Sequence, residues 1–315
     1  MWGLSLRLVM AKRPLKKRAK YSIIYYFVRF LIFVSNLVPR KIWLWFCGVL
    51  GRIAYTFASK TRELIILHLG MAYSKEKSLR EILDLSKETF KMLGKNAGDV
   101  LRARSVKSME DLNKFLVTHG IENFEAATAK GKGVIFLTCH LGAFDLQITN
   151  MALRGLKPNI IGTPLKDERL NDLLFNYRNA YGAVAVERGK KNFRLIKGLK
   201  SSGSIAILID QDTKVKSRFV NFFNMTAATP VGATILAMKT GAAVVPTYIY
   251  LGDDGMQHMH ILPEIPLVLT GDEEQDMIVN TQNYTSFIEE QVRAHPSQWV
   301  WMHERWKTRP GEEIV

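Results

Sequence analysis

Apolar runs and amphipathic stretches alternate along the chain between residues 134 and 251. The apolar runs have strand length and are bounded by turn residues, so they predict strands at 134–138, 159–162, 183–187, 204–209 and 243–251. The stretches between them show helical spacing and predict helices at 143–153, 167–181, 191–200 and 229–240. This alternation predicts an α/β fold, with a mostly parallel central sheet flanked by helices.

Start and stop signals refine several of these elements. Thr229 is placed to cap the helix predicted at 229–240, with Pro230 at its first position and Gly241 at its end. The run 247–262 predicts a hairpin, because Asp253, Asp254 and Gly255 form a turn sequence between two apolar stretches. Further helices are predicted near 276–294, in the amphipathic region 77–104, and in the stretch that begins at Gly120.

Two apolar stretches near the N-terminus, 21–38 and 42–58, differ from the rest of the chain. The first has eighteen residues and one charge, Arg29, whereas a bilayer span needs about 20 residues. Basic residues flank it on both sides, which conflicts with the positive-inside rule for a single crossing. We therefore expect in-plane helices or a shallow hairpin, with a true span as the alternative. The run is too long and begins too late to fit a secretory signal peptide.

Charge is concentrated in the same region. Residues 1–62 contain thirteen of the 44 Lys and Arg and none of the 29 Asp and Glu. A basic segment interleaved with apolar residues indicates an anionic membrane surface as partner, not nucleic acid. The sequence thus predicts a membrane-associating helical segment at 1–62 and a main domain at 63–315. Two cysteines, Cys47 and Cys139, give no disulfide framework and favour a cytoplasmic location for that domain.

The stretch TCHLGAFD, residues 138–145, follows a predicted strand and opens a predicted helix. Ligands of parallel α/β sheets bind at the carboxyl ends of the strands, so His140 is expected at the rim of a site. Asp145 lies in the first turn of the next helix, and we expect its carboxylate to bond to one nitrogen of that ring. A carboxylate on Nδ1 fixes the tautomer and stabilises the imidazolium, which predicts a general base.

The sequence offers no obvious nucleophile for this base. It contains no G-x-S-x-G motif, and Cys139 is expected to point away from His140 because adjacent strand residues face opposite sides. We therefore expect His140 to deprotonate a hydroxyl of a bound acceptor, which then attacks an activated carbonyl directly. No acyl-enzyme is needed.

Three further stretches carry candidate binding residues. Arg188, with Lys190 or Lys191, follows a predicted strand and is suited to bind a phosphate, although a solvated surface is the alternative. Another strand ends at 210–212, and its apolar loop with Phe219, Phe222, Phe223 and Met225 suits either an acyl-chain channel or core packing. The segment 295–310, rich in tryptophan and basic residues, suits an anionic headgroup or core packing. His258 and His260 share one strand face, but no third ligand is spaced for a metal, so none is predicted.

With these residues assembled, the chain resembles the late acyltransferases of lipid A biosynthesis, the lauroyl/myristoyl acyltransferase family within the lysophospholipid acyltransferase-like superfamily. The resemblance runs from about residue 21 to residue 310. It rests on HLGAFD, VERG, LIDQD, FFNMTAATPVGATILAMKTGAAVVP and, above all, PSQWVWMHERWKTRP. It implies a glycerolipid acyltransferase-like fold.

The resemblance further implies a membrane-associated enzyme on the cytoplasmic face of a bacterial inner membrane. Such an enzyme moves a fatty acyl chain from acyl carrier protein to a hydroxyl of an anionic glycolipid, a lipid A precursor, without a cofactor. By matching position, the resemblance implies that His140 is the base, Asp145 its partner and Arg188 a contact to an anionic group. It also implies a substrate-binding role for Asp212, the acidic residue after the Asp-Gln pair. The family commonly has Glu at 145 and Asn-Trp at 143–144, which leaves the acceptor open. The alternatives are a lysophospholipid or another glycolipid acceptor, and a non-catalytic membrane-binding protein.

Overall fold

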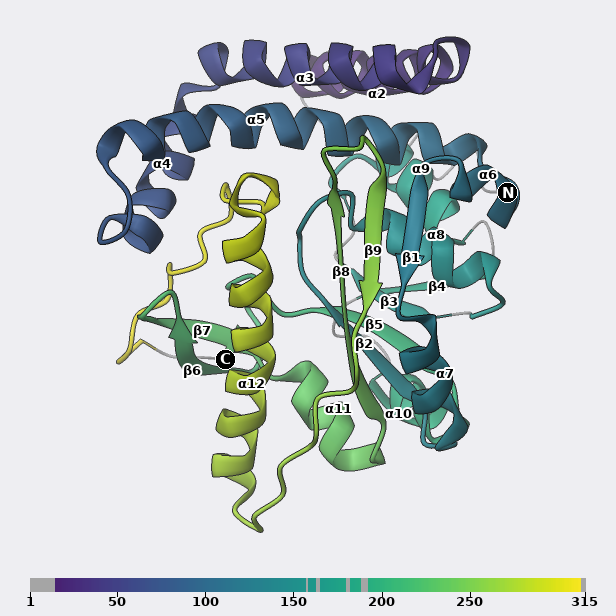
Figure 1. Ribbon diagram of the computed structural model, residues 1–315, viewed down its shortest axis with the longest axis vertical. Coiled ribbons are helices and arrows are strands. Elements are labelled where there is room, and N and C mark those ends of the chain that lie inside the picture. The colour runs from purple at the N-terminus through teal and green to yellow at the C-terminus, as the bar shows by residue number, and fades with distance from the viewer. Residues whose placement is uncertain (1–14, 157, 163–164, 180–181, 188–191, 313–315) are drawn as a thin grey trace.

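The computed structural model describes residues 15–156, 158–162, 165–179, 182–187 and 192–312 (Figure 1). At its centre is a seven-stranded sheet, in the order β1(Leu116–His119), β9(Gln257–Ile261), β8(Ala243–Leu251), β2(Val134–Thr138), β5(Ser204–Leu208), β3(Asn159–Gly162) and β4(Val184–Glu187). The five strands from β8 to β4 are parallel, and β9 is antiparallel to β8. The predicted α/β fold with a mostly parallel sheet is confirmed.

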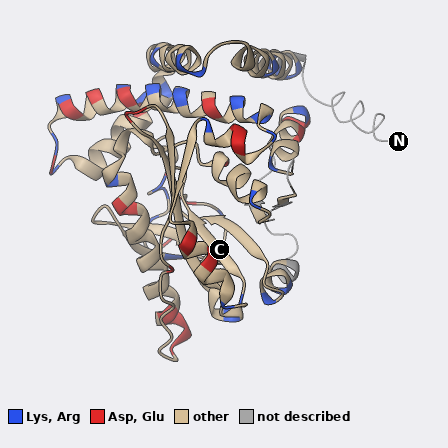
Figure 2. Ribbon diagram, turned by 45° about the vertical axis from the view of Figure 1, so that its right-hand side comes forward, with Lys and Arg blue, Asp and Glu red and all other residues tan. Residues whose placement is uncertain are grey.

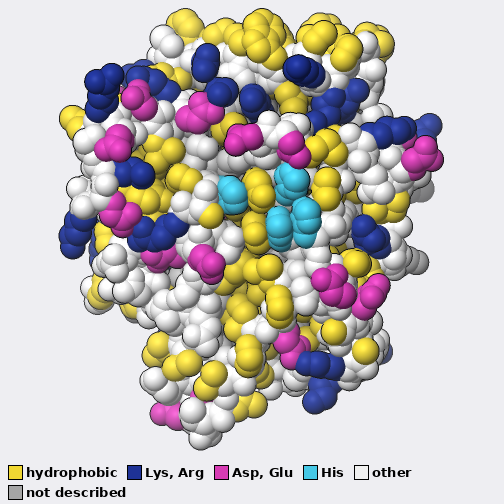
Figure 3. Space-filling model, in the orientation of Figure 1, with side chains coloured by type: hydrophobic (Ala, Val, Ile, Leu, Met, Phe, Trp, Pro, Cys, Tyr) yellow, Lys and Arg dark blue, Asp and Glu magenta, His cyan; other side chains and the backbone are white. Residues whose placement is uncertain are grey.

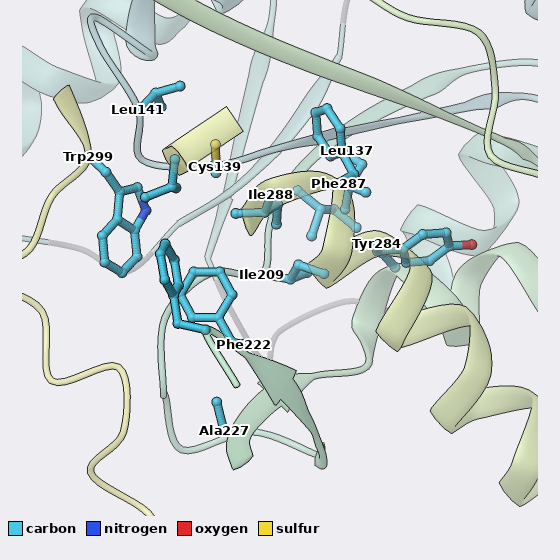
Figure 4. Packing of buried hydrophobic residues seen from close by; sticks show 14 of the residues in the cluster. Leu137, Cys139, Leu141, Ile209, Phe222, Ala227, Tyr284, Phe287, Ile288 and Trp299 are labelled. Carbon is cyan, nitrogen blue, oxygen red and sulfur yellow. The ribbon is translucent and has the colours of Figure 1, made fainter. Parts of the chain in front are cut away.

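Helices cover both faces of this sheet. One core contains side chains of α4(Ser59–Tyr73), α10(Asn192–Lys200), α11(Gly232–Thr240) and α12(Glu273–Ala294). The other contains side chains of α6(Met109–Asn113), α7(Ile121–Ala129), α8(Asp145–Leu153) and α9(Glu168–Asn179). Successive side chains of β2 alternate between the two cores, as the pleat requires: Ile135 and Leu137 lie in the first, Val134 and Phe136 in the second. Figure 4 shows Leu137 in the first core, near Ile288 of α12.

Most of the predicted elements occur with bounds within a few residues of those expected. Strand β1 had no prediction, since its four residues give too short a pattern. The helix predicted at 229–240 is wrong at its start: it begins at Gly232, and Thr229 and Pro230 belong to a strand. A Thr-Pro pair signals a helix start locally, but here pairing with a neighbouring strand decides the conformation.

That neighbour completes a hairpin in the stretch expected to be an apolar loop. β6(Ser217–Phe222) and β7(Met225–Pro230) pair antiparallel as a separate two-stranded sheet. The turn residues Phe223 and Asn224 have φ of 55° and 56°, as a two-residue turn of the I′ type requires. A left-handed phenylalanine is costly, and burial of its ring in the core compensates.

The N-terminal helices form a layer above the long helix α5(Leu79–Arg102). α2(Leu15–Leu37) and α3(Arg40–Phe57) lie along it at the top of Figure 1. α3 packs closely against α5 through two glycines: a Cβ at Gly51 would lie 2.2 Å from the carbonyl oxygen of Phe90, and one at Gly94 2.2 Å from that of Cys47. Trp43 stabilises this contact, because its indole Nε1 donates to the carbonyl of Gly98 at 2.8 Å.

The outer surface of α2 and α3 carries large apolar side chains. Figure 3 shows them at the top of the molecule, and Figure 2 shows basic but no acidic positions on both helices. The exposed residues are Ile23, Tyr26, Phe27, Phe30, Phe33, Leu37, Ile42, Trp45, Phe46, Ile53 and Phe57. None of the described helices is by itself long and apolar enough to cross a membrane; only α3 and α4, taken together with a bend of 94°, meet that criterion.

Candidate active site

His140 lies just beyond the carboxyl end of β2, at the rim of the sheet. Phe136, Thr138 and His140 alternate onto one side of the sheet and line the same pocket, whereas Cys139 is fully buried in the opposite core. The predicted orientation of Cys139 is confirmed. Burial, reinforced by the charge of Asp210, raises the pKa of its thiol well above the ordinary value, so it is a poor nucleophile.

The carboxylate that holds His140 is that of Asp210, beyond the end of β5. Its Oδ1 lies 2.8 Å from Nδ1 of the ring, and its Oδ2 accepts from the backbone N–H of His140 at 2.7 Å. The indole Nε1 of Trp299 donates to Oδ2 at 2.8 Å. Strands β2 and β5 are parallel neighbours with Thr138 opposite Leu208, so both polar residues lie two positions past a paired residue.

Asp210 is charged in this arrangement. Burial by itself would raise the pKa of its carboxyl, but the charge of His140 and the hydrogen bonds from His140 and Trp299 outweigh it and lower the pKa to about 2. A carboxylate on Nδ1 puts the proton there, because it accepts only, and leaves Nε2 as the basic nitrogen. Nε2 has no hydrogen-bond partner among the described residues, and the side chain is 21% exposed.

Asp145 does not make the predicted bond to His140. Its Oδ1 accepts from Nε and Nη2 of Arg178, on α9, at 3.0 and 2.8 Å. The reason is that Asp210 already occupies Nδ1, while the ring of Phe144 packs against the imidazole with 4.9 Å between centroids. The Asp145–Arg178 pair is nearly buried, with side chains 12% and 14% exposed, and it forms part of the wall of the same pocket.

The turn between β2 and α8 is fixed by Gly142. Its φ is 59°, and a Cβ there would lie 2.2 Å from the carbonyl oxygen of Ile249. Its N–H donates to the carbonyl of Gln298 at 2.9 Å, and the carbonyl of His140 accepts from Val300 at 3.2 Å. The C-terminal segment, residues 295–310, thus holds in place the loop that carries the imidazole of His140.

His140 opens onto a pocket of about 360 Å³. Its polar lining includes Asp145, Arg178, Gln211 and His303. The apolar part of the wall consists of Phe136, Phe144, Ile148, Met151, Ile160, Leu165, Leu174, Ala206 and Leu208. An apolar cavity with a few convergent polar groups is the usual form of a small-molecule site, and this one suits a hydrocarbon chain with a reactive polar end.

Two buried polar atoms in this wall lack a partner within the described parts of the chain: Oε1 of Gln147 and Oγ1 of Thr247. The amide nitrogen of Gln147 donates to Thr138 at 2.8 Å, which leaves its oxygen free to accept. Buried polar groups are seldom left unsatisfied, so both atoms are candidates for contact with a bound molecule.

The C-terminal segment contributes a second imidazole. The ring of His303 lies 5.5 Å from that of His140, centroid to centroid. Burial first, and then the charge of His140, lower the pKa of His303 below the ordinary value, which keeps it neutral at neutral pH. Trp299, Trp301 and Trp306 are buried in the first core, so core packing accounts for the tryptophans of the segment.

Arg305, in the same segment, is a fully buried cation. Its Nη1 donates to the carbonyl of Ala228 at 2.6 Å, and its Nη2 to Oγ1 of Thr229 at 2.5 Å. Burial lowers the pKa of its guanidinium to about 10, although Asp210 and Asp212 act in the opposite direction. It therefore supplies a positive charge that helps to keep Asp210 ionised in the interior.

The remaining predicted site residues have different positions. Asp212 accepts from the N–H and hydroxyl of Thr308, at 2.6 and 3.0 Å, and so anchors the C-terminal segment. Phe223 lies in the first core, 2% exposed, and not along the wall of the His140 pocket, because the hairpin turns its ring inward. Arg188 and Lys191, and with them Lys190, lie outside the described residues.

His258 and His260 share one face of β9, as predicted, and stack with neighbouring rings. Across the described residues, no group of three or more His, Cys, Asp or Glu side chains has the arrangement of a metal site.

Comparison with known proteins gives a consistent set of matches. The family model described as bacterial lipid A biosynthesis acyltransferase matches residues 10–308. The phosphatidylinositol mannoside acyltransferase of Mycobacterium tuberculosis is 24% identical over 194 residues, 60% of this chain and 60% of that protein. In Escherichia coli K12, the lipid A biosynthesis palmitoleoyltransferase is 25% identical over 289 residues, 86% of this chain and 90% of its own length. The lauroyltransferase of the same organism is 25% identical over 273 residues, 84% of each chain.

Proposed function

Since the chain belongs to the bacterial lipid A biosynthesis acyltransferase family, we propose that it transfers a fatty acyl group from a carrier thioester to a hydroxyl of a membrane glycolipid. The observation that carries this proposal is the His140–Asp210 pair at the mouth of a largely apolar pocket. A base with a free Nε2 is what hydroxyl activation needs, and the apolar wall suits the acyl chain.

The proposed reaction proceeds without a covalent enzyme intermediate. Nε2 of His140 takes the proton of the acceptor hydroxyl as its oxygen attacks the thioester carbonyl. The tetrahedral intermediate then expels the thiolate with cleavage of the C–S bond, and the imidazolium returns its proton to the sulfur. Asp210, ionised and bonded to Nδ1, stabilises the imidazolium between the two proton transfers.

Arg178 and His303 assist at the mouth of the pocket. The guanidinium of Arg178 is fixed by two bonds to Asp145, which leaves Nη1 to bind an anionic group of the acceptor. A neutral His303 donates or accepts a hydrogen bond beside His140 without adding a charge that would compete for the proton. In this scheme Asp145 positions Arg178 and does not touch His140.

We infer the donor from the family and the membrane partner from charge and exposure. The family resemblance implies an acyl carrier protein as donor and a reaction without a cofactor. The exposed apolar side chains of α2 and α3, together with the absence of acidic residues from residues 1–62, support docking of both helices into the cytoplasmic leaflet of a bacterial inner membrane.

The proposed acceptor is a lipid A precursor, as two of the relatives are named for lipid A biosynthesis. A second candidate is another glycolipid, since the mycobacterial relative is named for acylation of phosphatidylinositol mannoside. The two candidates share the same base, the same pocket and the same anionic character of the acceptor.

The test is an acyl-transfer assay with purified protein and acyl carrier protein bearing a labelled chain. A lipid A precursor, a phosphatidylinositol mannoside and a lysophospholipid serve as acceptors, and mass spectrometry identifies the product. His140→Ala should reduce the rate on the order of 10²–10⁴-fold and leave the melting temperature nearly unchanged. An unaltered rate in the folded variant would overturn the mechanism, and labelling of the lysophospholipid alone would overturn the acceptor assignment.

A further inference from the structure

A second hollow lies away from the active site, between α3, α5 and the turn that joins β8 to β9. This α3–α5 groove has a volume of about 750 Å³ and shares no lining residue with the His140 pocket. Its lining includes five basic residues and three acidic ones. The basic residues are Arg40, Lys41, Arg52, Lys91 and Lys95, and the acidic ones are Glu88, Asp253 and Asp254.

Two of the five cations are neutralised by hydrogen-bonded partners. Arg40 donates to Asp99 from Nε and Nη2, at 2.8 and 2.7 Å, and Lys91 donates to Glu88 at 2.7 Å. The remaining three, Lys41, Arg52 and Lys95, have no hydrogen-bonded acidic partner among the residues that the structure describes.

Of the acids, Glu88 is paired with Lys91, and Asp254 is bonded to His258. Asp253 acts on Lys95, but the three remaining cations outnumber it. The groove thus has a surplus of positive charge. Burial is the main cause that lowers the pKa of the Lys95 ammonium group; repulsion from Lys91 and Arg52 adds to it, while Glu88 and Asp253 act in the opposite direction.

The same groove has an apolar side. Leu44, Trp45, Val49 and Met92 line it, and the indole of Trp45 is 66% exposed. Trp45 is one of the exposed apolar side chains that α3 contributes beside those of α2. Cations beside an exposed tryptophan and aliphatic side chains match a molecule that is anionic at one end and hydrocarbon at the other.

We infer that the α3–α5 groove binds the phosphate of an anionic phospholipid through Lys41, Arg52 and Lys95, with the acyl chains lying along Trp45. This inference rests on the membrane docking part of the proposed function and not on the acyl-transfer chemistry. An acidic protein would match the cations equally well, but it would not account for the large exposed apolar side chains that adjoin them. The lipid would fix the depth and rotation of the protein at the membrane.

The first experiment measures binding of the full chain to vesicles by sedimentation. It compares vesicles of phosphatidylcholine with vesicles that also contain 30% phosphatidylglycerol, roughly the anionic share that gives a strong surface potential. The groove variant is Lys41→Gln/Arg52→Gln/Lys95→Gln. The matched control, Lys197→Gln/Lys200→Gln/Lys239→Gln, removes three charges from α10 and α11, at the opposite end of the molecule from α2 and α3 (Figure 1).

The groove variant should lose roughly a hundredfold in affinity for the anionic vesicles, because each basic residue near such a surface contributes a several-fold gain. The control should lose less than about threefold, and binding of both variants to pure phosphatidylcholine should equal that of the unaltered chain. Equal losses in the two variants would mean that only net charge matters and would overturn the assignment to the groove.

The second experiment uses the shape of the groove and leaves its charge intact. A Cβ at Gly48 would lie 3.4 Å from Cγ of Lys91 and from Cε of Lys95, so Gly48→Leu fills the groove against flexible side chains. The probe is dihexanoyl phosphatidylglycerol below its micelle concentration, titrated into the protein. Gly48→Leu and the groove variant should both lose binding, whereas the matched control should retain it.

This second arm separates the groove from membrane docking as a whole. If the unaltered chain binds no vesicle of either kind, the docking part of the proposed function fails. Binding of the soluble lipid still tests whether the groove is a lipid site. Unchanged binding of dihexanoyl phosphatidylglycerol by both Gly48→Leu and the groove variant would overturn the inference. So would a groove variant that keeps its lipid affinity but loses acyl carrier protein in solution, since the groove would then be a docking site for an acidic protein.

Discussion

Asp210 holds His140 by its ring and by its backbone at once. One carboxylate oxygen lies 2.8 Å from Nδ1, and the other accepts from the main-chain N–H at 2.7 Å. The imidazole is therefore fixed in orientation and tautomer by a residue seventy positions further along the chain. Asp145, only five positions from His140, accepts two hydrogen bonds from Arg178 instead.

Asp210→Asn should abolish most activity while the protein stays folded. The amide oxygen can still accept from His140 N–H and Trp299, but the amide nitrogen then faces Nδ1 and donates to it, which places the ring proton on Nε2. A base with its proton on the reacting nitrogen cannot deprotonate the acceptor, so we expect a loss on the order of 10²–10⁴-fold in kcat.

The comparison variant is Asp212→Asn, two residues away. Among the described residues the carboxylate of Asp212 bonds to Thr308, so its loss should loosen the C-terminal segment and leave kcat within a few-fold. The measurement is the steady-state kcat of both variants. A larger loss at Asp212 than at Asp210 would restore the role in substrate binding that the family resemblance implies for Asp212.

Asp145 and Arg178 should behave as one unit. Their ion pair is nearly buried, so removing either partner leaves the other unpaired, and a double-mutant cycle with Asp145→Asn and Arg178→Gln should give a coupling of about 0.5–3 kcal/mol. Both single variants should raise KM for the acceptor more than they lower kcat, because the pair is proposed to bind an anionic group.

The informative comparison is a second cycle, between Asp145→Asn and Asp210→Asn. These two carboxylates share no hydrogen-bond partner among the described residues, so their effects on kcat should be additive. A strong coupling between them, with none between Asp145 and Arg178, would instead support Asp145 as the partner of His140.

Gly142→Ala should destabilise the protein more than an ordinary glycine substitution. At φ of 59° any Cβ is strained, and here it would also lie 2.2 Å from the carbonyl oxygen of Ile249, a rigid backbone atom. Gly131→Ala is the matched control, because Gly131 has φ of 67° but a Cβ there would meet no atom within 4 Å. Left-handed strain by itself costs about 1–3 kcal/mol.

The measurement is chemical unfolding of both variants. We expect Gly131→Ala to show only the strain cost, and Gly142→Ala to show a clearly larger loss accompanied by reduced activity, since the carbonyl and ring of His140 are set by the same loop. Equal losses in the free energy of unfolding would mean that the loop at Gly142 accommodates the extra Cβ without disturbing the site.

Stability should fall as the pH decreases from neutrality, and His260 should contribute to this. Burial first, then the charges of His119, His258 and His295, lower the pKa of His260 from 6.5 to about 4. Between these values the unfolded chain binds a proton that the folded chain does not, so the free energy of unfolding falls with falling pH. Its contribution is complete above about pH 6.5 and is lost progressively toward pH 4.

His260→Gln replaces the titrating imidazole with a neutral side chain of similar polarity. Thermal melts at about pH 7 and pH 5, on either side of the ordinary histidine pKa, should show a smaller drop in Tm for the variant than for the unaltered chain. An identical pH dependence with and without His260 would show that its protonation is not linked to folding.

Much of the scaffold is predictable because its signals are local. The alternation of apolar side chains in β2 follows from the pleat of a strand, and it correctly places His140 on one side of the sheet and Cys139 on the other. The signal for Asp210 was also present, as a polar residue after a buried strand, but its partner depends on which strands become neighbours. The position of β5 next to β2 is a property of the whole sheet.

The hairpin at 217–230 shows the same limit for secondary structure. Thr229 and Pro230 are a good local start for a helix, yet they form a strand, because pairing with β6 and the bond from buried Arg305 to Thr229 outweigh that preference. Phe223 likewise follows the turn into the core, so of the two roles expected for its loop, core packing applies to it and the acyl-chain channel does not.

By itself the sequence determined the α/β scaffold, the basic apolar N-terminal segment and the rim position of His140, since each depends on spacing along one stretch of chain. Only the tertiary structure decided that Asp210 holds the imidazole, that Asp145 binds Arg178, and that His303 reaches the same pocket. Short-range periodicity is set by backbone geometry, whereas the meeting of polar side chains far apart in the chain depends on strand order and on the packing of the final segment over the sheet.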